Sequence, residues 1–222
     1  MLFGAAVFTA VADRTVALKL VQESETARRQ GNFPEAERLS DQALKYARKQ
    51  YGDESGRVAE VLETRGALYA DEQRFDIAEG EFTKARLLRQ NLYGIDSPEY
   101  GRICEVLGTF YTDRGRYPEA EACLRRALAV VETQAENGTA KKEKDDPLAN
   151  FMEVLRGPQD PDESRVLGEL GWLYSKQGQY PQAEAAYKRA MAIREKLLSP
   201  NHLALKKNVE DLKLLDSLQR KF

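Results

Sequence analysis

Gly31-Asn-Phe-Pro-Glu-Ala36, Gln73-Arg-Phe-Asp-Ile-Ala78, Gly115-Arg-Tyr-Pro-Glu-Ala120 and Gly178-Gln-Tyr-Pro-Gln-Ala183 are four versions of one short pattern. The aromatic residues of the first three stretches stand 42 residues apart. The fourth follows after 63 residues, which is one further step with 21 inserted residues. Self-similarity at such a period is typical of proteins built from stacked structural repeats.

The pattern predicts a tight turn that leads into a helix. Proline is tolerated in the first helical turn, where its missing N–H would have no partner, and Pro34, Pro118 and Pro181 stand there. Asp76 takes this place in the second stretch and suits a helix N-terminus by its charge. Alanines recur on one face of this helix: Ala36, Ala43, Ala78, Ala85, Ala120, Ala127, Ala183 and Ala190. The helix before it carries a glycine and, three residues later, a tyrosine: Gly66 and Tyr69, Gly108 and Tyr111, Gly171 and Tyr174. Each unit is therefore expected to be an antiparallel helix pair.

This periodicity predicts helices and no strands. We expect them near residues 14–30, 34–51, 55–72, 76–93, 97–114, 118–134, 162–177, 181–198 and 203–219.

The repeated residues resemble those of the tetratricopeptide repeat. The third unit carries Leu107-Gly108, Tyr111, Gly115, Tyr117, Ala120, Leu124 and Ala127, and the fourth carries Leu170-Gly171, Tyr174, Gly178, Tyr180, Ala183, Tyr187 and Ala190. The usual period is about 34 residues. The 42-residue step is similar to the repeats of kinesin light chains, whose connecting loops resemble the stretches 93–98 and 199–203 here. The resemblance implies an all-α fold, a right-handed superhelical solenoid of about four antiparallel helix pairs plus a C-terminal capping helix.

On this basis we divide the chain into an apolar N-terminal segment and one repeat domain. The segment covers residues 1–12 and the domain 13–222. The repeats are expected at about 17–54, 55–96, 97–134 and 161–198, with an insertion at about 135–160 and the capping helix at about 203–219.

Two segments admit more than one interpretation. Residues 1–12 are an apolar lead-in that packs on the first repeat, the remnant of an export signal, or a short membrane anchor; we favour the first, because a basic n-region is missing. In the insertion, Leu148, Phe151, Met152 and Leu155 have the spacing of a short amphipathic helix. It either packs on its own repeats or acts as a lid over a binding surface.

Composition and motifs argue against catalysis and nucleic-acid binding. The net charge is −2 and the pI about 5.7, without the basic excess that phosphate recognition needs. Cys104 and Cys123 have no metal-binding spacing and are expected to be buried thiols. His202, the single histidine, is expected to be a hydrogen-bonding loop residue. We therefore expect no enzyme activity, no catalytic residues, no metal and no cofactor.

The remaining function is recognition of another protein. In tetratricopeptide arrays the first helices of successive pairs line a concave groove for a peptide or a helix, so the resemblance implies a non-enzymatic scaffold. The register then predicts the groove-facing residues: Glu60, Glu63, Ala67, Ala70, Asp71, Arg102, Glu105, Thr109, Thr112, Asp113, Arg165, Trp172, Ser175 and Lys176. Of these, Glu63, Arg102, Glu105, Arg165 and Trp172 are expected to carry recognition.

The expected partner is a protein or peptide, with no small-molecule substrate, and the expected location is cytoplasmic. Two alternatives stay open. The chain is a structural subunit or self-associating array of a larger complex, or it is an exported or membrane-tethered adaptor held through residues 2–12.

Overall fold

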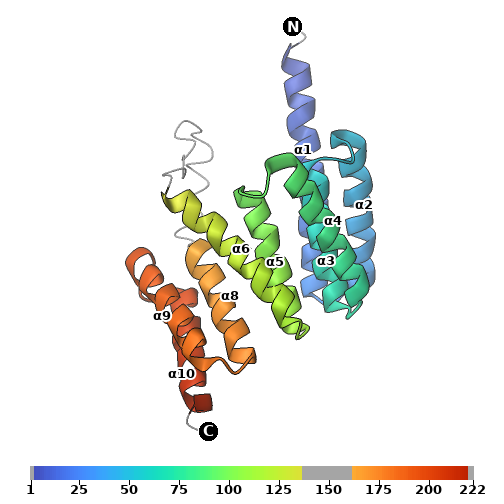
Figure 1. The fold of residues 1–222 in the computed structure, drawn as a ribbon. Coiled ribbons are helices and arrows are strands. Elements are labelled where there is room, and N and C mark those ends of the chain that lie inside the picture. The colour runs from blue at the N-terminus through green and yellow to red at the C-terminus, as the bar shows by residue number, and fades with distance from the viewer. Residues whose placement is uncertain (1–2, 137–161, 220–222) are drawn as a thin grey trace. The chain divides into compact units, whose positions relative to one another are not determined.

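The computed structural model describes residues 3–136 and 162–219. Within these ranges the fold is all α-helix (Figure 1). The helices are α1 (Phe3–Arg29), α2 (Phe33–Tyr51), α3 (Gly56–Asp71), α4 (Phe75–Tyr93), α5 (Pro98–Asp113), α6 (Tyr117–Glu136), α8 (Asp162–Lys176), α9 (Tyr180–Leu197) and α10 (Leu203–Gln219). Apart from the start of α1, the bounds expected from the sequence agree with these within two residues.

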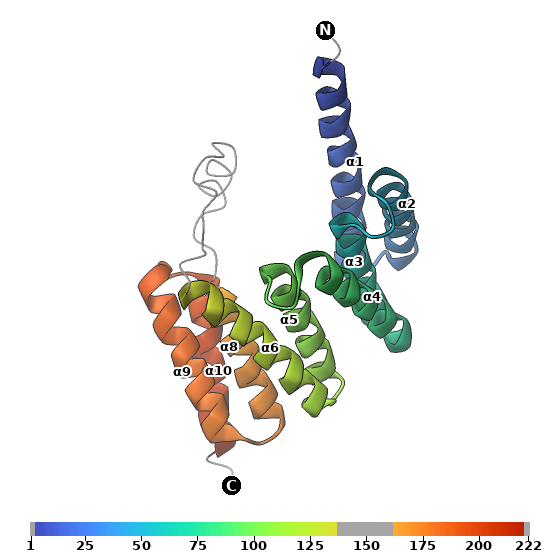
Figure 2. The same cartoon turned by 45° about the horizontal axis from the view of Figure 1, so that its top comes forward.

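The chain forms two compact units, residues 1–95 and 96–222. Unit 1 contains the consecutive helix pairs α1/α2 and α3/α4, and unit 2 contains α5/α6, α8/α9 and the final helix α10. In unit 2, α8 also packs against α6 and α5, and α9 contacts both α8 and α10 (Figure 2). The predicted organisation in helix pairs is therefore confirmed.

The turn inside each pair explains the repeated sequence pattern. Gly31, Gly115 and Gly178 have φ angles of 72–73°, in the left-handed region where a side chain is disfavoured. The N–H of the residue before each aromatic then bonds to a carbonyl oxygen five residues earlier, which satisfies the end of the first helix. These bonds are Asn32 to Ala27, Arg74 to Tyr69, Arg116 to Tyr111 and Gln179 to Tyr174, all at 2.8–2.9 Å.

The glycines of the first helices allow the two helices of a pair to approach closely. A Cβ atom on Gly66 would lie 2.5 Å from the ring of Phe82, and one on Gly108 would lie 2.5 Å from Cγ of Leu124. On Gly171 it would lie 2.6 Å from the ring of Tyr187. The alanines expected on the facing helices are at most 1% exposed, which confirms the predicted stripe of small residues: Ala36, Ala43, Ala78, Ala85, Ala120, Ala127, Ala183 and Ala190.

The first helix differs from its expected bounds. It begins at Phe3 rather than near residue 14, so most of the apolar segment 1–12 continues directly into the first repeat. The stretch after Gly4 is rich in alanine and contains no proline, so nothing in it ends a helix. No helix in the described ranges combines the length and the apolar character that crossing a membrane requires.

The insertion expected at residues 135–160 begins with the last turn of α6, which ends at Glu136. The amphipathic helix and the lid expected for this insertion fall on residues 137–161, outside the described residues.

Helix α10 covers the last pair. Leu215 is 2% exposed and packs with Ala183 and Tyr187 of α9, and Leu205 is also buried. Asn208 is fully buried, and its side-chain amide donates a hydrogen bond of 3.0 Å to the carbonyl oxygen of Tyr187. This packing supports the interpretation of residues 203–219 as a capping helix.

Candidate partner-binding face

The first helices of unit 2, α5 and α8, together form one face of that unit, which we call the α5/α8 face. Arg102, Glu105, Thr109 and Asp113 recur along α5 at intervals of three or four residues, so they share one side of that helix. From α8, Arg165 reaches the side chain of Glu105 and Glu169 reaches that of Thr109. The sequence-predicted residues of α5 and α8 are therefore neighbours in the fold.

A bidentate ion pair joins the two helices. Nε of Arg165 donates to one carboxylate oxygen of Glu105 over 2.5 Å, and Nη2 donates to the other over 2.8 Å. Asp162 lies 2.8 Å from the same guanidinium. The hydrogen bonds to Glu105 are the main reason that the pKa of Arg165 is raised. Glu105 is 8% exposed, so this pair fixes the relative position of α5 and α8.

A second polar contact lies one turn further along. The hydroxyl of Thr109 donates to the carboxylate of Glu169 over 3.2 Å. Burial raises the pKa of Glu169, and the negative charges of Glu105 and Asp113 raise it further, although the positive charge of Lys207 acts in the opposite direction. Sequence reasoning missed Glu169 as a member of this face.

Trp172 lies on the same helix, half-buried. The ammonium group of Lys176 lies over its indole ring, 4.2 Å from the ring centroid, which is a cation–π contact. The hydroxyl of Ser175 donates to the carbonyl oxygen of Gly171 within the helix, over 2.8 Å. Trp172 therefore presents an aromatic surface that already accepts a cation.

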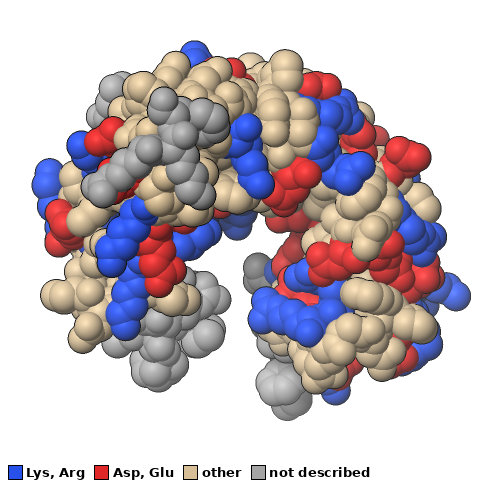
Figure 3. Space-filling view, turned by 90° about the horizontal axis from the view of Figure 1, so that it is seen from below, with Lys and Arg blue, Asp and Glu red and all other residues tan. Residues whose placement is uncertain are grey.

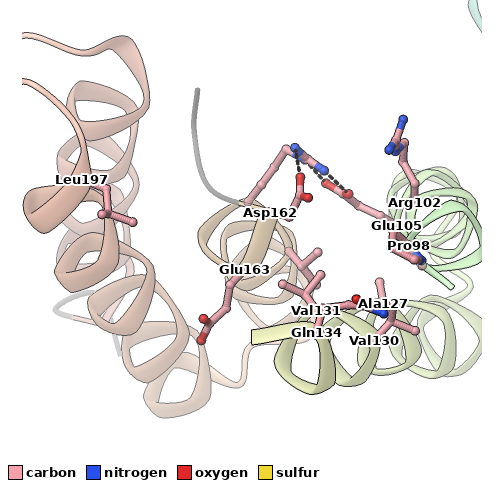
Figure 4. A pocket seen from close by; sticks show the side chains of 13 residues that line it. Pro98, Arg102, Glu105, Ala127, Val130, Val131, Gln134, Asp162, Glu163 and Leu197 are labelled. Carbon is pink, nitrogen blue, oxygen red and sulfur yellow. Dashed lines mark hydrogen bonds and ion pairs between the residues drawn. The ribbon is translucent and has the colours of Figure 1, made fainter. Parts of the chain in front are cut away.

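A cavity of about 540 Å³ opens beside the ion pair (Figure 4). Its walls are the apolar side chains of Ala127, Val130, Val131 and Val166, with Leu197 at its edge. Charged side chains of Arg102, Glu105, Asp162, Glu163 and Arg165 surround it. Such a combination of apolar walls and a charged margin suits a protein side chain or a short peptide segment.

The predicted residues of unit 1 lie on α3 and are described within that unit. Glu60 pairs with Arg57 at 2.7 Å, and Glu63 pairs with Arg89 at 2.5 Å. Asp71 pairs with Arg28 of α1. Ala67 and Ala70 are half-buried. The carboxylates expected to face a partner are thus held by cations of their own unit.

Three further predicted residues of unit 2 differ in exposure. Arg102 and Asp113 are exposed. Thr112 is only 2% exposed, and its hydroxyl donates to the carbonyl oxygen of Gly108, so this residue does not face a partner as expected. It lies one residue from Asp113, and a step of one turns a helical side chain by about 100°.

His202 caps the start of α10. Its Nδ1 accepts a hydrogen bond of 3.2 Å from the backbone N–H of Ala204. This confirms the prediction that it is a hydrogen-bonding loop residue.

The surface charge is mixed rather than segregated. On the face seen in Figure 3, lysine and arginine side chains alternate with aspartate and glutamate over the described residues, and neither sign fills a broad patch. Recognition on such a surface depends on local groups rather than on a single-sign field.

The fold and the α5/α8 face define the class of helical-repeat proteins whose units are helix pairs. The tetratricopeptide repeat family model matches residues 57–133 and 148–196, and the chain belongs to this family. Proteins with this repeat generally act as scaffolds for protein–protein interaction.

Solved structures with a similar fold include kinesin-light-chain-like repeat proteins. BtubC (BKLC) from P. vanneervenii is 23% identical, with a TM-score of 0.62 over 86% of this chain and 68% of that one. A putative kinesin light chain from Podospora anserina with nearly identical TPR-like repeats is 16% identical, with a TM-score of 0.61 over 91% of this chain and 94% of that one. At these identities the likeness shows the fold alone. Comparison with curated proteins found no match.

Proposed function

We propose that this chain is a non-enzymatic scaffold that binds a protein partner, as an extended peptide or a helix, on the α5/α8 face. The observation that carries the proposal is the cavity of about 540 Å³ that adjoins Arg102, Glu105 and Arg165, all three predicted from the repeat register. Its apolar lining offers a contact surface, and the charged margin offers orientation. No cofactor enters this proposal.

The predicted residues divide into two roles. Arg102 and Asp113 are exposed and Trp172 is half-buried. All three are proposed to contact the partner, since aromatic and arginine side chains dominate interface energetics. Glu105 and Arg165 bind each other and are proposed to hold the two helices in place. The predicted α3 residues Glu60, Glu63, Ala67 and Asp71 are proposed as a separate contact surface of unit 1.

A cytoplasmic location belongs to the same proposal. Cys104 and Cys123 form no disulfide. Free thiols are typical of proteins from reducing compartments.

The test uses peptides chosen without knowledge of the natural partner. A library of random peptides is selected on the 222-residue chain, and affinities are measured by fluorescence anisotropy for the wild type, Arg102→Glu and Trp172→Ala. We expect about ten-fold weaker binding for each variant. The control is Lys196→Glu, an exposed base on α9 that lines neither this cavity nor the one between α8, α9 and α10, and it should change affinity less than about two-fold.

If the selected peptides bind both variants as tightly as the wild type, the α5/α8 face is not the binding surface. If no peptide is enriched over several rounds, peptide recognition itself is contradicted.

Self-association is a second candidate, and one observation favours it. On α10 the side chains of Leu203 and Leu214 are 78% and 52% exposed. A second copy could cover these leucines, which would make the chain a self-associating array or a structural subunit.

A further inference from the structure

A second, smaller cavity of about 260 Å³ lies between α8, α9 and α10. It shares Arg165 and Trp172 with the α5/α8 face. From α10 it adds Lys207 and Asp211, which follow Arg165 and Glu169 by one 42-residue step. Helix α10 thus repeats in sequence and in space the arrangement of charges on α8.

The arginines that line this cavity are already engaged. Arg165 binds Glu105 and Asp162. Arg194 is 6% exposed; its Nη1 donates to the side-chain oxygen of Asn208 over 2.6 Å, and its Nη2 donates to the carbonyl oxygen of Ser164 over 3.2 Å. The carboxylates of Glu105 and Asp162 balance the charge of Arg165, whereas the acceptors named here for Arg194 are neutral, so its positive charge also acts on Asp211.

The other charged groups that line the cavity are two carboxylates and one ammonium group. They are Glu169, Asp211 and Lys207. Among the described residues, Glu169 has only the hydrogen bond from Thr109, and Asp211 and Lys207 have neither a hydrogen bond nor an ion pair, although Lys207 is close enough to influence both carboxylates. Burial raises the pKa of both acids, which shows that their charged forms are incompletely solvated.

Aromatic groups complete the cavity. Trp172 and the buried Tyr187 both line it. The contact of Lys176 with the indole ring shows that this aromatic surface is compatible with a cation. An aromatic wall beside unpaired carboxylates favours a cationic side chain with an apolar stem.

We propose that this cavity receives a lysine or arginine side chain of the protein partner, whose cationic group lies between Glu169 and Asp211 while its stem lies along Trp172. This rests on the proposed function, because the cavity shares residues with the α5/α8 face. Lys207, exposed at the margin, acts as an internal competitor for the two carboxylates. The two carboxylates beside the aromatic wall, rather than the net charge of the chain, select the partner residue.

The test uses two small probes and the fluorescence of Trp172, the single tryptophan of the chain. Nα-acetyl-arginine methylamide should produce a saturable change in emission that weakens with salt. Nα-acetyl-citrulline methylamide has nearly the same shape without the charge and should produce none. Glu169→Gln should weaken binding of the arginine probe about five- to ten-fold, because a charge-assisted contact is lost.

Lys207→Gln is expected to change the affinity for the arginine probe in the opposite direction. Removing the competing ammonium should tighten binding of the arginine probe by about three-fold or more. Lys206→Gln is the matched control, because Lys206 is the exposed neighbour on α10 and does not line this cavity. It should leave the affinity unchanged. A gain of affinity cannot arise from a damaged fold, so this comparison does not depend on the stability of the variants.

Three results would overturn the inference: an equal response to the citrulline probe, an unchanged affinity in Glu169→Gln, or weaker binding in Lys207→Gln. The last would show that Lys207 contributes to binding rather than competing with the cationic probe. If Arg102→Glu still weakens binding of selected peptides while the arginine probe fails, the proposed function stands and only this assignment falls.

Discussion

Gln73 is the residue whose backbone departs furthest from what its side chain favours. Its φ angle is 62°, in the turn position that glycine occupies in the other three repeats. A side chain in the left-handed region costs about 1–2 kcal/mol. Gln73→Gly should therefore raise the free energy of unfolding by about 1 kcal/mol, less the backbone entropy that glycine adds to the unfolded chain. Urea unfolding followed by circular dichroism measures this.

The reverse exchange is the control for that prediction. Gly115 has a φ angle of 72°, and a Cβ atom added to it would have no other atom within 4 Å, so Gly115→Gln changes the strain without a steric clash. It should lower the free energy of unfolding by about 1 kcal/mol. A destabilised Gln73→Gly variant would contradict the interpretation of this turn.

Gly→Ala substitutions in the helices should change stability in opposite directions at packed and at unpacked glycines. A methyl group at Gly66, Gly108 or Gly171 would meet a buried side chain at 2.5–2.6 Å, so each Gly→Ala variant should lose about 1–3 kcal/mol. Gly80, on α4, has no atom within 4 Å of that position, and Gly80→Ala should gain about 0.5–1 kcal/mol from the better helix propensity. Thermal unfolding of the four variants measures the difference, and a common sign for all four would contradict the close packing.

Glu169 predicts a pH dependence of defined sign. Its pKa is higher in the folded chain than in the unfolded chain, so the folded state binds the proton more tightly. The stabilisation that this tighter proton binding gives to the folded state is fully present below the ordinary glutamate pKa. It is lost as the pH rises through the raised pKa of Glu169 in the folded chain. Glu169→Gln should therefore be more stable than the wild type at neutral pH, with a difference that shrinks as the pH is lowered. Chemical denaturation at about pH 4 and about pH 7 tests this, and a wild type more stable than the variant at neutral pH would contradict it.

At the scale of single elements, α3 carries an arginine where its counterparts have leucine. Arg65 stands at the position of Leu107 and Leu170, and its side chain is 11% exposed. The guanidinium is held by Asp41, by Glu81 at 3.2 Å and by the hydroxyl of Tyr69 at 2.9 Å. The charge thus has partners on both α2 and α4. Burial raises the pKa of Tyr69 to about 12 within this network.

Breaking this network should affect stability strongly. Glu81 is 7% exposed, and Glu81→Ala leaves Arg65 with only the exposed Asp41 as an ionic partner. We expect a loss of about 2–4 kcal/mol, because the largely buried guanidinium of Arg65 loses its buried carboxylate partner. Lys84→Ala removes the exposed partner of the same carboxylate and should cost less than about 1 kcal/mol. Equal losses in urea unfolding would show that the buried pair has no special role.

Much of the fold could be predicted from the 42-residue step, because small residues and turn glycines recur wherever helices approach. The start of α1 could not, since its apolar stretch lacks any stop signal and is compatible with several structures.

The candidate site was only partly predictable. The register identified Arg102, Thr109 and Trp172 on the first helices, but it did not reveal that Glu105 and Arg165 bind each other, which depends on side-chain conformation. A purely capping interpretation of α10 misses Lys207 and Asp211. The 42-residue step itself predicts Lys207 and Asp211 as the counterparts on α10 of Arg165 and Glu169 on α8, and thus as neighbours of Glu169.

At the scale of the whole molecule, two charged residues of α10 disfavour self-association by stacking of a further repeat on this helix. One repeat step beyond Gly171 and Tyr174 stand Lys213 and Asp216, both exposed. The small residue and the ring that α3, α5 and α8 use for packing are therefore replaced by charges, so a further helix would not dock there in the same way. Light scattering should give a mass near 25.1 kDa at all concentrations. A mass that rises with concentration would favour the self-associating alternative.

The central claim, that a partner binds over the α5/α8 face, is tested most directly at Trp172. Emission and acrylamide quenching are recorded while a selected peptide is added, and its binding is followed in parallel by anisotropy. We predict that emission moves to shorter wavelength and that quenching falls at the same concentrations at which the peptide binds. Complete binding with unchanged emission and unchanged quenching would contradict the claim.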